Sequence, residues 1–351
     1  MDRASRQPAR AATLQSVADA AGVHRSTAAR ALNAATRHLI SGEVVARVQD
    51  EARRLGYRRD ALAASLRTGR SRLVGVLLPD LANPVFAPIL GGIEGLLASR
   101  GYSALVAHAP ADQERRIAIV EQLITRRVDG LILATARRSD PVLTYCLEAG
   151  TPTVLVNRAE DSARAPSVVS DDAGGMRLAV QHLSALDHAR IGHLAGPQDL
   201  STGVLRRMGF ETAMCEAGLD PSAIATAGAY TREAGRAATA ELLDRTELSA
   251  IVAANDLLAL GAYQELAARG LACPREISVV GHNDMPLVDM VDPPLTTVRI
   301  DHLAMGREAA RLVVARIEDG LEEPLVRTTE PSLVVRASTA APTGPSPRRH
   351  R

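Results

Sequence analysis

The chain of 351 residues has no lysine, no tryptophan, two phenylalanines and three cysteines. Cys146, Cys215 and Cys273 lie far apart without Cys-x-x-Cys spacing, which argues against a disulfide framework and a thiolate metal site. No apolar run reaches the ~18 residues of a membrane-spanning helix. The chain also does not open on the charged, apolar and small-residue segments of an export signal. We therefore expect a cytoplasmic protein that does not contact a membrane.

Sequence signatures of enzymes are also missing. There is no nucleophile elbow, P-loop, HExxH or dinucleotide fingerprint, so we expect no catalysis and no cofactor. His182, His188 and His193 fall on a helix, a turn and a strand, and this spacing does not converge on a metal ion. The C-terminal end has no leucine heptad, so nothing predicts a tetramerising coiled coil.

Because lysine is missing, arginine supplies all of the positive side chains other than histidine. Residues 1–72 hold 14 arginines against 6 acids, a net charge of +8, and residues 73–351 hold 27 against 34, a net charge of −7. A basic head on an acidic body is typical of a nucleic-acid-binding domain fused to another domain. Arginine can contact phosphates and can also donate two hydrogen bonds to one guanine.

Residues 13–33, TLQSVADAAGVHRSTAARALN, predict two short helices joined by a turn at Gly22. Small apolar residues repeat at helical spacing on the inner faces: Val17, Ala18, Ala21, Ala28, Ala31 and Leu32. The outer face of the second helix then carries Arg25, Ser26, Ala29 and Arg30, with Asn33 at its end. This pattern favours a helix-turn-helix whose second helix enters the major groove. The alternative is a small helical hairpin with solvated arginines.

A third helix is expected after Ser41, a candidate N-cap, and should end at Gly56. From residue 73 the pattern changes to alternating strands and helices, which predicts parallel α/β architecture. Expected helices are 85–100, 112–126, 140–149, 172–186, 203–217, 231–245, 256–269 and 302–318. Expected strands are 73–79, 102–109, 129–136, 151–157, 189–196, 223–230, 249–255, 276–284, 295–301, 323–331 and 332–338. Two such series imply two lobes, with a cleft where the carboxyl ends of their strands meet.

The N-terminal motif T-L-x-x-V-A-x-x-A-G-V-x-x-x-T-x-x-R-x-L-N resembles the start of the lactose-repressor/galactose-repressor (LacI/GalR) family of bacterial regulators. Matching phrases continue at residues 79–86, 182–197, 205–210, 252–262, 277–285 and 293–300. The resemblance implies a small all-α helix-turn-helix head followed by a two-lobed α/β sensor domain of the periplasmic-binding-protein type. It also implies a homodimeric repressor that binds a near-palindromic operator and responds to a small molecule, such as a sugar or related metabolite. A two-lobe solute receptor without a DNA role is the alternative.

The resemblance divides the chain into a flexible tail (1–12), the head (13–58), a hinge (59–71), the sensor (72–340) and a disordered tail (341–351). The family's hinge helix usually follows Pro-Asn, whereas this chain has Arg59-Asp60 there. Eight residues are far fewer than the ~12–15 of a stable isolated helix, so this hinge would fold only on DNA, and a plain linker is the alternative. DNA contacts are implied for Thr13, Arg25, Ser26, Thr27, Ala29, Arg30, Asn33, Ala63 and the minor-groove wedge Leu66.

Ligand contacts are implied for six residues of the sensor: Phe86, Asn157, Arg206, Tyr230, Asn255 and Asn283. Arg206 would clamp two hydroxyls or a carboxylate. The three asparagines would hydrogen-bond hydroxyls, and Asp256 would cap the helix that follows Asn255. Phe86 and Tyr230 would stack on the apolar face of a sugar ring, with core packing as the alternative for Phe86.

Overall fold

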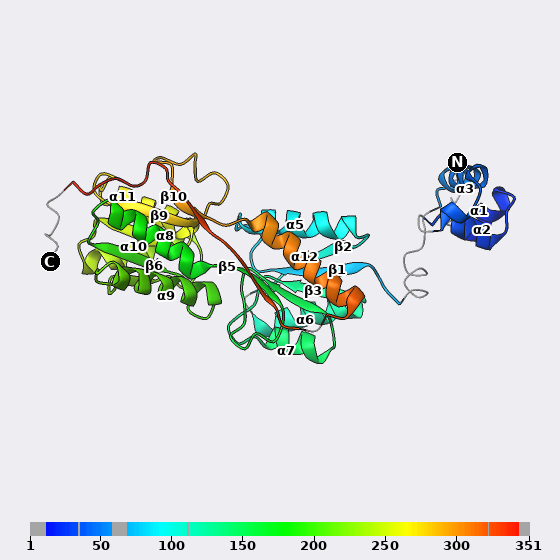
Figure 1. Ribbon diagram of the computed structural model, residues 1–351, viewed down its shortest axis with the longest axis horizontal. Helices are drawn as coiled ribbons and strands as arrows, with labels where there is room; N and C mark the ends of the chain where they lie inside the picture. The colour runs from blue at the N-terminus through cyan, green and yellow to red at the C-terminus, as the bar shows by residue number, and fades with distance from the viewer. Residues whose placement is uncertain (1–11, 34–35, 58–68, 111, 322, 344–351) are drawn as a thin grey trace, which may run out of the picture. The chain divides into compact units, whose positions relative to one another are not determined.

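The computed structural model describes residues 12–33, 36–57, 69–110, 112–321 and 323–343 (Figure 1). It separates into two compact units, Met1–Ser71 and Arg72–Arg351. We call the first unit the head and the second the sensor, and describe each by itself.

The head contains α1 (Leu14–Ala20), α2 (Arg25–Ala31), the 3-10 turn η1 (Arg37–Leu39) and α3 (Gly42–Arg54). Thr13 caps α1, because its Oγ1 accepts from the Ser16 N–H at 3.2 Å while Ser16 Oγ accepts from the Thr13 N–H at 2.8 Å. This reciprocal capping box fixes where the helix begins. Gly22 has φ +63°, the left-handed conformation expected at the turn between α1 and α2.

The core of the head is made of small side chains. Its fully buried members are Val17, Ala18, Ala28, Ala31 and Val48. These positions include the inner faces predicted from helical spacing for the first two helices, and buried Val48 shows that α3 packs on this pair. Because alanine is small, the three short helices can pack closely through these positions. The charged side chains of α2 lie on its other face and are exposed.

The sensor is built on two six-stranded sheets with the same strand order. In the first sheet the order is β11-β5-β4-β3-β1-β2, and in the second it is β12-β10-β9-β8-β6-β7. The first comprises β1 (Leu73–Leu78), β2 (Ser103–His108), β3 (Gly130–Leu133), β4 (Thr153–Val156), β5 (Ser167–Ser170) and β11 (Val326–Thr329). The second comprises β6 (Ile191–Ala195), β7 (Ile224–Thr226), β8 (Ala250–Ala253), β9 (Ser278–Asn283), β10 (Thr296–Arg299) and β12 (Ser332–Val334). All neighbouring strands are parallel except the pair of β10 and β12.

Helices cover the two sheets. The first lobe carries α5 (Phe86–Ser99), α6 (Gln113–Thr125), α7 (Pro141–Glu148) and α12 (His302–Asp319). The second lobe carries α8 (Asp172–Ala185), α9 (Ser201–Glu216), α10 (Arg232–Arg245) and α11 (Asp256–Ala268). The predicted helices are confirmed to within two residues at either end. β5 was not predicted, and β7 is shorter than expected, because residues 227–231 form a loop.

The chain passes between the lobes three times. It leaves the first lobe between β5 and α8, returns between β10 and α12, and leaves again between β11 and β12. Two of these connections carry helix caps, since Asp171 Oδ1 accepts from the Gly174 N–H and Asp301 Oδ1 from the Ala304 N–H, each at 2.9 Å. The first lobe is therefore completed by the C-terminal part of the sequence.

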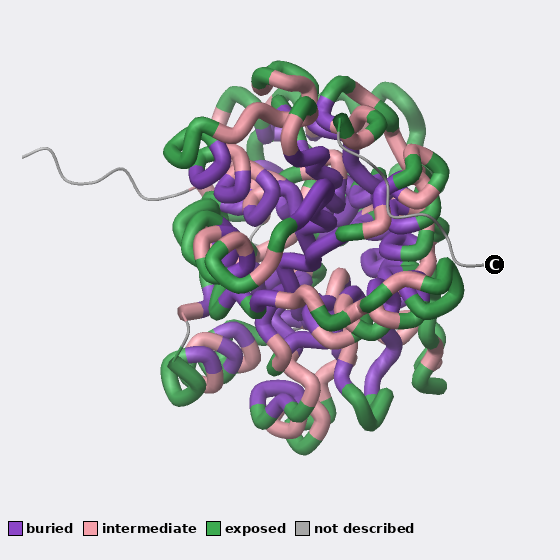
Figure 2. The backbone as a smooth tube through the Cα atoms, turned by 90° about the vertical axis from the view of Figure 1, so that its left-hand side faces the viewer, coloured by how far each residue is buried: buried purple, intermediate pink, exposed green. Residues whose placement is uncertain are grey.

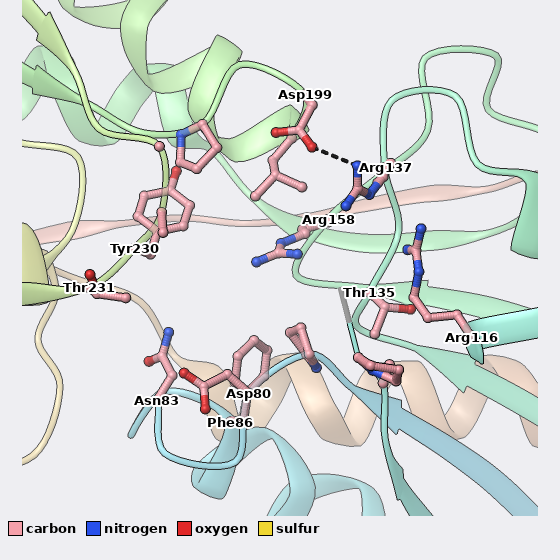
Figure 3. Close-up of a pocket in the computed structure, with 17 residues that line it drawn as sticks. Asp80, Asn83, Phe86, Arg116, Thr135, Arg137, Arg158, Asp199, Tyr230 and Thr231 are labelled. Atoms are coloured by element: carbon pink, nitrogen blue, oxygen red, sulfur yellow. Dashed lines mark ion pairs between the residues drawn. The ribbon is translucent and has the colours of Figure 1, made fainter. Parts of the chain in front are cut away.

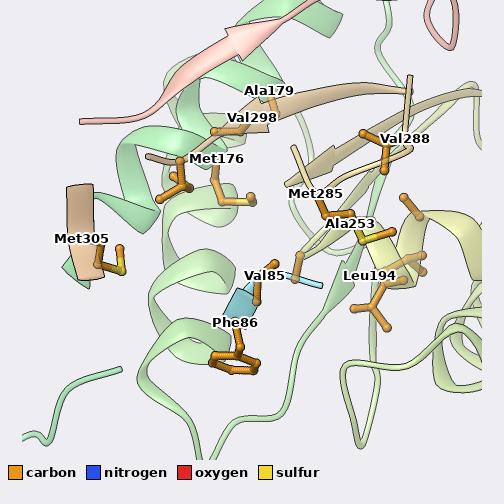
Figure 4. Close-up of a cluster of buried hydrophobic side chains, with 14 of the residues drawn as sticks. Val85, Phe86, Met176, Ala179, Leu194, Ala253, Met285, Val288, Val298 and Met305 are labelled. Atoms are coloured by element: carbon orange, nitrogen blue, oxygen red, sulfur yellow. The ribbon is translucent and has the colours of Figure 1, made fainter. Parts of the chain in front are cut away.

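Buried stretches of the chain gather toward the inside of the sensor, and exposed stretches lie along its outside (Figure 2). One buried cluster contains residues from both lobes, including Phe86 and Met305 of the first and Met176 and Leu194 of the second (Figure 4). Helices α5 and α12 lie side by side (Figure 1). Their contact requires glycine, because a Cβ on Gly306 would lie 2.0 Å from the Ile89 carbonyl oxygen.

Candidate functional site

The second helix of the head presents two arginines to solvent. Arg25 and Arg30 are both exposed, and no ion pair involves either of them within the described parts of the chain. Ser26 is exposed too, although its Oγ lies 2.8 Å from His24 Nδ1, whereas Thr27 and Ala29 are half-buried. Two guanidinium groups and a small residue on one short helix can reach guanine edges and phosphates.

The remaining residues predicted to contact DNA are Thr13, Asn33, Ala63 and Leu66. The Thr13 hydroxyl is engaged in the cap of α1. Asn33 follows α2 and is half-buried, and its backbone N–H donates to the Arg30 carbonyl at 3.1 Å. Ala63 and Leu66, with most of the predicted hinge, lie outside the described residues.

In the sensor, a cavity of about 270 Å³ is lined by loops from both lobes (Figure 3). From the first lobe, the loops that follow its strands contribute Pro79, Asp80, Asn83 and Phe86 after β1, Ala109 and Pro110 after β2, Thr135 and Arg137 after β3, and Arg158 after β4. Helix α6 adds Arg116. From the second lobe, the loops contribute Pro197, Asp199 and Leu200 after β6 and residues 228–231 after β7. All of these loops follow the carboxyl ends of parallel strands. They also flank β1 and β6, where the strand order reverses, which is the common ligand position in open α/β sheets.

Two aromatic rings line this cavity, Phe86 and Tyr230. Phe86 begins α5, and the Tyr230 hydroxyl lies 3.2 Å from Thr202 Oγ1, to which it donates. The Tyr230 ring needs glycine beneath it, because a Cβ on Gly196 would lie 2.3 Å from the phenol oxygen. Burial raises the pKa of Tyr230, so the phenol stays a neutral donor at pH 7.

Three arginines also line the cavity, and sequence analysis did not single them out. Arg137 pairs with Asp199 of the other lobe at 3.1 Å (Figure 3). Arg116 and Arg158 make no ion pair within the described residues, and the Nε of each is buried without a hydrogen-bond partner there. Burial lowers the pKa of both guanidinium groups. Arg158 closely follows the end of β4, and this position is the sequence signal that could have identified it, whereas Arg116 lies within α6.

Arg206, predicted as a ligand clamp, lies among the buried groups of the second lobe. Its Nε donates to Asp172 Oδ1 at 2.8 Å and its Nη1 to the Ala254 carbonyl at 2.6 Å. The two side chains are 4% and 2% exposed. The guanidinium thus has an internal carboxylate partner, and Arg206 is not among the residues that line the cavity.

The three asparagines do not line this cavity either. Asn255 caps α11 by accepting from the Leu258 N–H at 2.9 Å. Asn283 is buried, and its Oδ1 lies 3.2 Å from His282 Nδ1. Asn157 is half-buried with φ +66° and immediately precedes Arg158. The structure thus brings together Phe86 and Tyr230 of the six predicted ligand residues.

The predicted capping role of Asp256 is wrong, because Asn255 occupies that position. The Asp256 carboxylate instead accepts from Thr297 Oγ1 at 2.6 Å and from the Met285 N–H at 2.8 Å. Burial raises the pKa of Asp256 to about 7. This acid therefore connects α11 to strand β10 and to the loop after β9.

The buried histidines predict a pH dependence of the sensor's stability. His193 is fully buried, stacks on Phe210 with ring centroids 4.7 Å apart, and donates from Nδ1 to the Val252 carbonyl at 2.8 Å. Burial lowers the pKa of His193 to about 4, and that of His302 to about 4. Between pH 6.5 and 4 the unfolded chain therefore binds more protons at these sites, so the free energy of unfolding should fall as pH falls.

A site that is protonated in the unfolded state but not in the folded state changes the free energy of unfolding by about 1.4 kcal/mol per pH unit. The raised pKa of Asp256 has the opposite effect, because it makes the free energy of unfolding rise as pH falls. The test therefore compares, between variants, the slope of the free energy of unfolding against pH. Urea unfolding of His193→Gln should depend less on pH than unfolding of the parent, whereas His108→Gln, at an exposed position, should leave the slope unchanged. Equal slopes for all three proteins would contradict the assignment.

A head with an arginine-bearing reader helix, joined to a two-lobed sensor with an inter-lobe cavity, defines a ligand-responsive DNA-binding regulator. Residues 180–339 match the family of periplasmic binding protein-like domains. The chain is 34% identical to the HTH-type transcriptional regulator CelR of Thermobifida fusca, over 93% of this chain and 98% of that protein. It is 30% identical to the HTH-type transcriptional repressor CytR of Escherichia coli K12, over 94% and 97% of the two chains.

Solved structures agree with these relatives. A lac repressor dimer bound to operator and an anti-inducer has a TM-score of 0.83 at 27% identity, covering 95% of this chain and 100% of that one. The CelR–cellobiose complex has a TM-score of 0.73 at 33% identity, covering 93% and 99%. The chain belongs to the LacI family of HTH-type transcriptional regulators. The predicted family and fold class are confirmed, and a DNA-binding regulator is supported over a solute receptor. Among the described helices, none is long and apolar enough to span a bilayer.

Proposed function

We propose that the protein is a cytoplasmic repressor that binds a near-palindromic operator as a homodimer, without catalytic activity. We further propose that a small molecule in the cavity, a sugar or related metabolite, changes its affinity for operator. The observation that carries this proposal is that loops from both lobes line one cavity beside two aromatic rings. Relatives with a bound sugar, such as the CelR–cellobiose complex, support the ligand class.

The proposed coupling follows from where the head joins the sensor. The Arg72 N–H donates to Asp129 Oδ2 at 2.8 Å, and the Arg72 guanidinium pairs with Glu318 of α12 at 3.2 Å. The start of the sensor is thus held firmly on the first lobe. A ligand that contacts both lobes favours one inter-lobe angle, and rotation of two first lobes in a dimer would change the separation of the hinges. Separated hinges would release operator, and hinges brought together would strengthen binding.

In this proposal residues 59–71 form the hinge, which folds only on operator and places Leu66 between base steps. Arg206 and the three asparagines were predicted to contact the ligand but do not line the cavity. In this proposal they would shape the second lobe or contact the ligand after the lobes rotate. Operator and effector are then linked by a reciprocal coupling free energy, typically ~1–3 kcal/mol.

Sequencing of genomic fragments bound by the purified protein should identify an operator with two half-sites related by a two-fold axis. Two identical heads in a symmetric dimer impose that symmetry on the DNA. A protection footprint should cover both half-sites, and operator titrations at fixed salt should shift about 5- to 150-fold with the effector. A footprint over one asymmetric half-site would contradict the dimer, and turnover of the bound sugar would contradict a purely regulatory role.

A further inference from the structure

The charges that line the cavity are unbalanced. Arg116, Arg137 and Arg158 face two acids, Asp80 and Asp199. Asp199 is already paired with Arg137, and Asp80 is an exposed residue whose Oδ1 accepts from the Ala82 N–H at 2.8 Å. Two guanidinium groups of the cavity are therefore left without a carboxylate among the described residues.

Arg158 is the better placed of the two. It follows β4, and Figure 3 shows its guanidinium projecting into the open centre of the cavity, on the side that faces Tyr230. Its buried Nε has no hydrogen-bond partner within the described chain. Arg116 lies on α6 beside Thr135, and Arg116 Nε and Thr135 Oγ1 are likewise buried without partners there. Three side chains that line one cavity thus each hold a polar atom without a hydrogen-bond partner within the described residues.

A cation that is partly removed from water and unpaired is costly, and Arg158 is half-buried. A charge-assisted pair with an oxyanion is short, strong and, for arginine, often bidentate. A neutral ligand would satisfy hydrogen bonds but would displace water from Arg158 without balancing its charge. A volume of about 270 Å³ lies near the lower end for ligand pockets, which favours a small molecule. Phe86 and Tyr230 offer flat apolar surfaces to its ring.

We propose that the effector is a small polyol that carries an oxyanion, a carboxylate or a phosphate, and that Arg158 binds this group. The inference rests on the proposed function, because it names the ligand class of the same cavity. Arg116 and Thr135 supply further donors on the first lobe. Asp80 and Asn83 lie at the other side of the cavity (Figure 3), where they would hydrogen-bond the neutral hydroxyls of the ligand.

The test is calorimetric titration of the full-length protein with matched neutral and anionic probes at fixed salt. The probes are glucose, glucuronate and glucose 6-phosphate, galactose and galacturonate, and ribose and ribose 5-phosphate. At least one anionic probe should bind tenfold or more tightly than its neutral counterpart. Comparison of the uronates with the sugar phosphates shows whether the bound oxyanion is a carboxylate or a phosphate.

Arg158→Gln should reduce that preference to less than threefold, and Arg158→Lys, which keeps the charge but loses the planar fork, should retain part of it. Arg138→Gln is the matched control, because Arg138 pairs with Asp161 at 2.8 Å and does not line the cavity. Its preference should equal that of the parent. Thermal unfolding of each variant verifies that it is folded.

The inference is overturned if no anionic probe binds, if neutral probes bind as tightly, or if the preference survives in Arg158→Gln. Operator titrations on the same samples distinguish a failure of the oxyanion inference from a failure of the proposed function. A neutral sugar that binds and shifts operator affinity would uphold the regulator and reject the oxyanion. A protein that binds no operator with or without probes would contradict the proposed function alone.

Discussion

Replacing Arg206 with alanine should lower the sensor's free energy of unfolding by about 3–5 kcal/mol, because it leaves a buried carboxylate without its cation. Arg206 and Asp172 are almost completely buried, and their Nε–Oδ1 distance is 2.8 Å. Among the described residues, Asp172 would keep the hydroxyl of Ser170, which donates to it at 2.8 Å. Urea unfolding monitored by circular dichroism measures the change.

The next residue in the chain provides a matched control. Arg207 is half-exposed and pairs with Glu211 one turn along α9, so Arg207→Ala should cost less than about 1 kcal/mol. Combining Arg206→Ala with Asp172→Asn should recover part of the lost stability, because no unpaired charge remains. If Arg206→Ala left unfolding unchanged but removed the effector response, Arg206 would be the ligand clamp that the family resemblance implies.

Alanine at both Arg25 and Arg30 should weaken operator binding by about 2–6 kcal/mol, if each guanidinium makes one bidentate guanine contact worth about 1–3 kcal/mol. Both side chains are exposed, so the thermal stability of the head should not change. Fluorescence anisotropy at fixed salt, on operator and on a scrambled duplex, measures affinity and specificity together.

Arg30→Ala alone should relax the preference at one base pair of each half-site. Arg53→Ala, on the exposed side of α3 where it pairs with Asp50, serves as a control for loss of charge from the head. An equal loss of affinity for operator and scrambled duplex would instead assign Arg25 and Arg30 to phosphates.

The helices and most strands could be predicted because their apolar residues repeat at the required spacing. β5 could not, because its four residues begin and end with serine, and their strand conformation depends on pairing with β4 and β11. The end of β7 was also missed. Apolar alternation continues through residue 230, but Tyr230 faces the cavity and the backbone leaves the sheet after Thr226.

The ligand residues were harder to predict than the fold. A sequence shows that Arg206 occurs on a helix near a cleft, but not that Asp172, 34 positions earlier, reaches its guanidinium. Arg158 was overlooked because its position after the end of β4, the available sequence signal, is shared by cations in cavities and by cations in solvent. Only the packing of the two lobes, which depends on contacts between residues distant in sequence, shows whether an arginine lines the cavity, pairs with a buried acid or lies in solvent.

The three passages of the chain between the lobes constrain how the protein is made. A ribosome delivers the N-terminal part first, and domains generally fold as units in that order. The first lobe cannot be completed in this way, because α12 and β11 belong to it and are synthesised after nearly all of the second lobe. A nascent chain that stops at residue 300 would expose the face of α5 that Gly306 normally covers. The sensor should therefore become protease-resistant only when synthesis is almost finished.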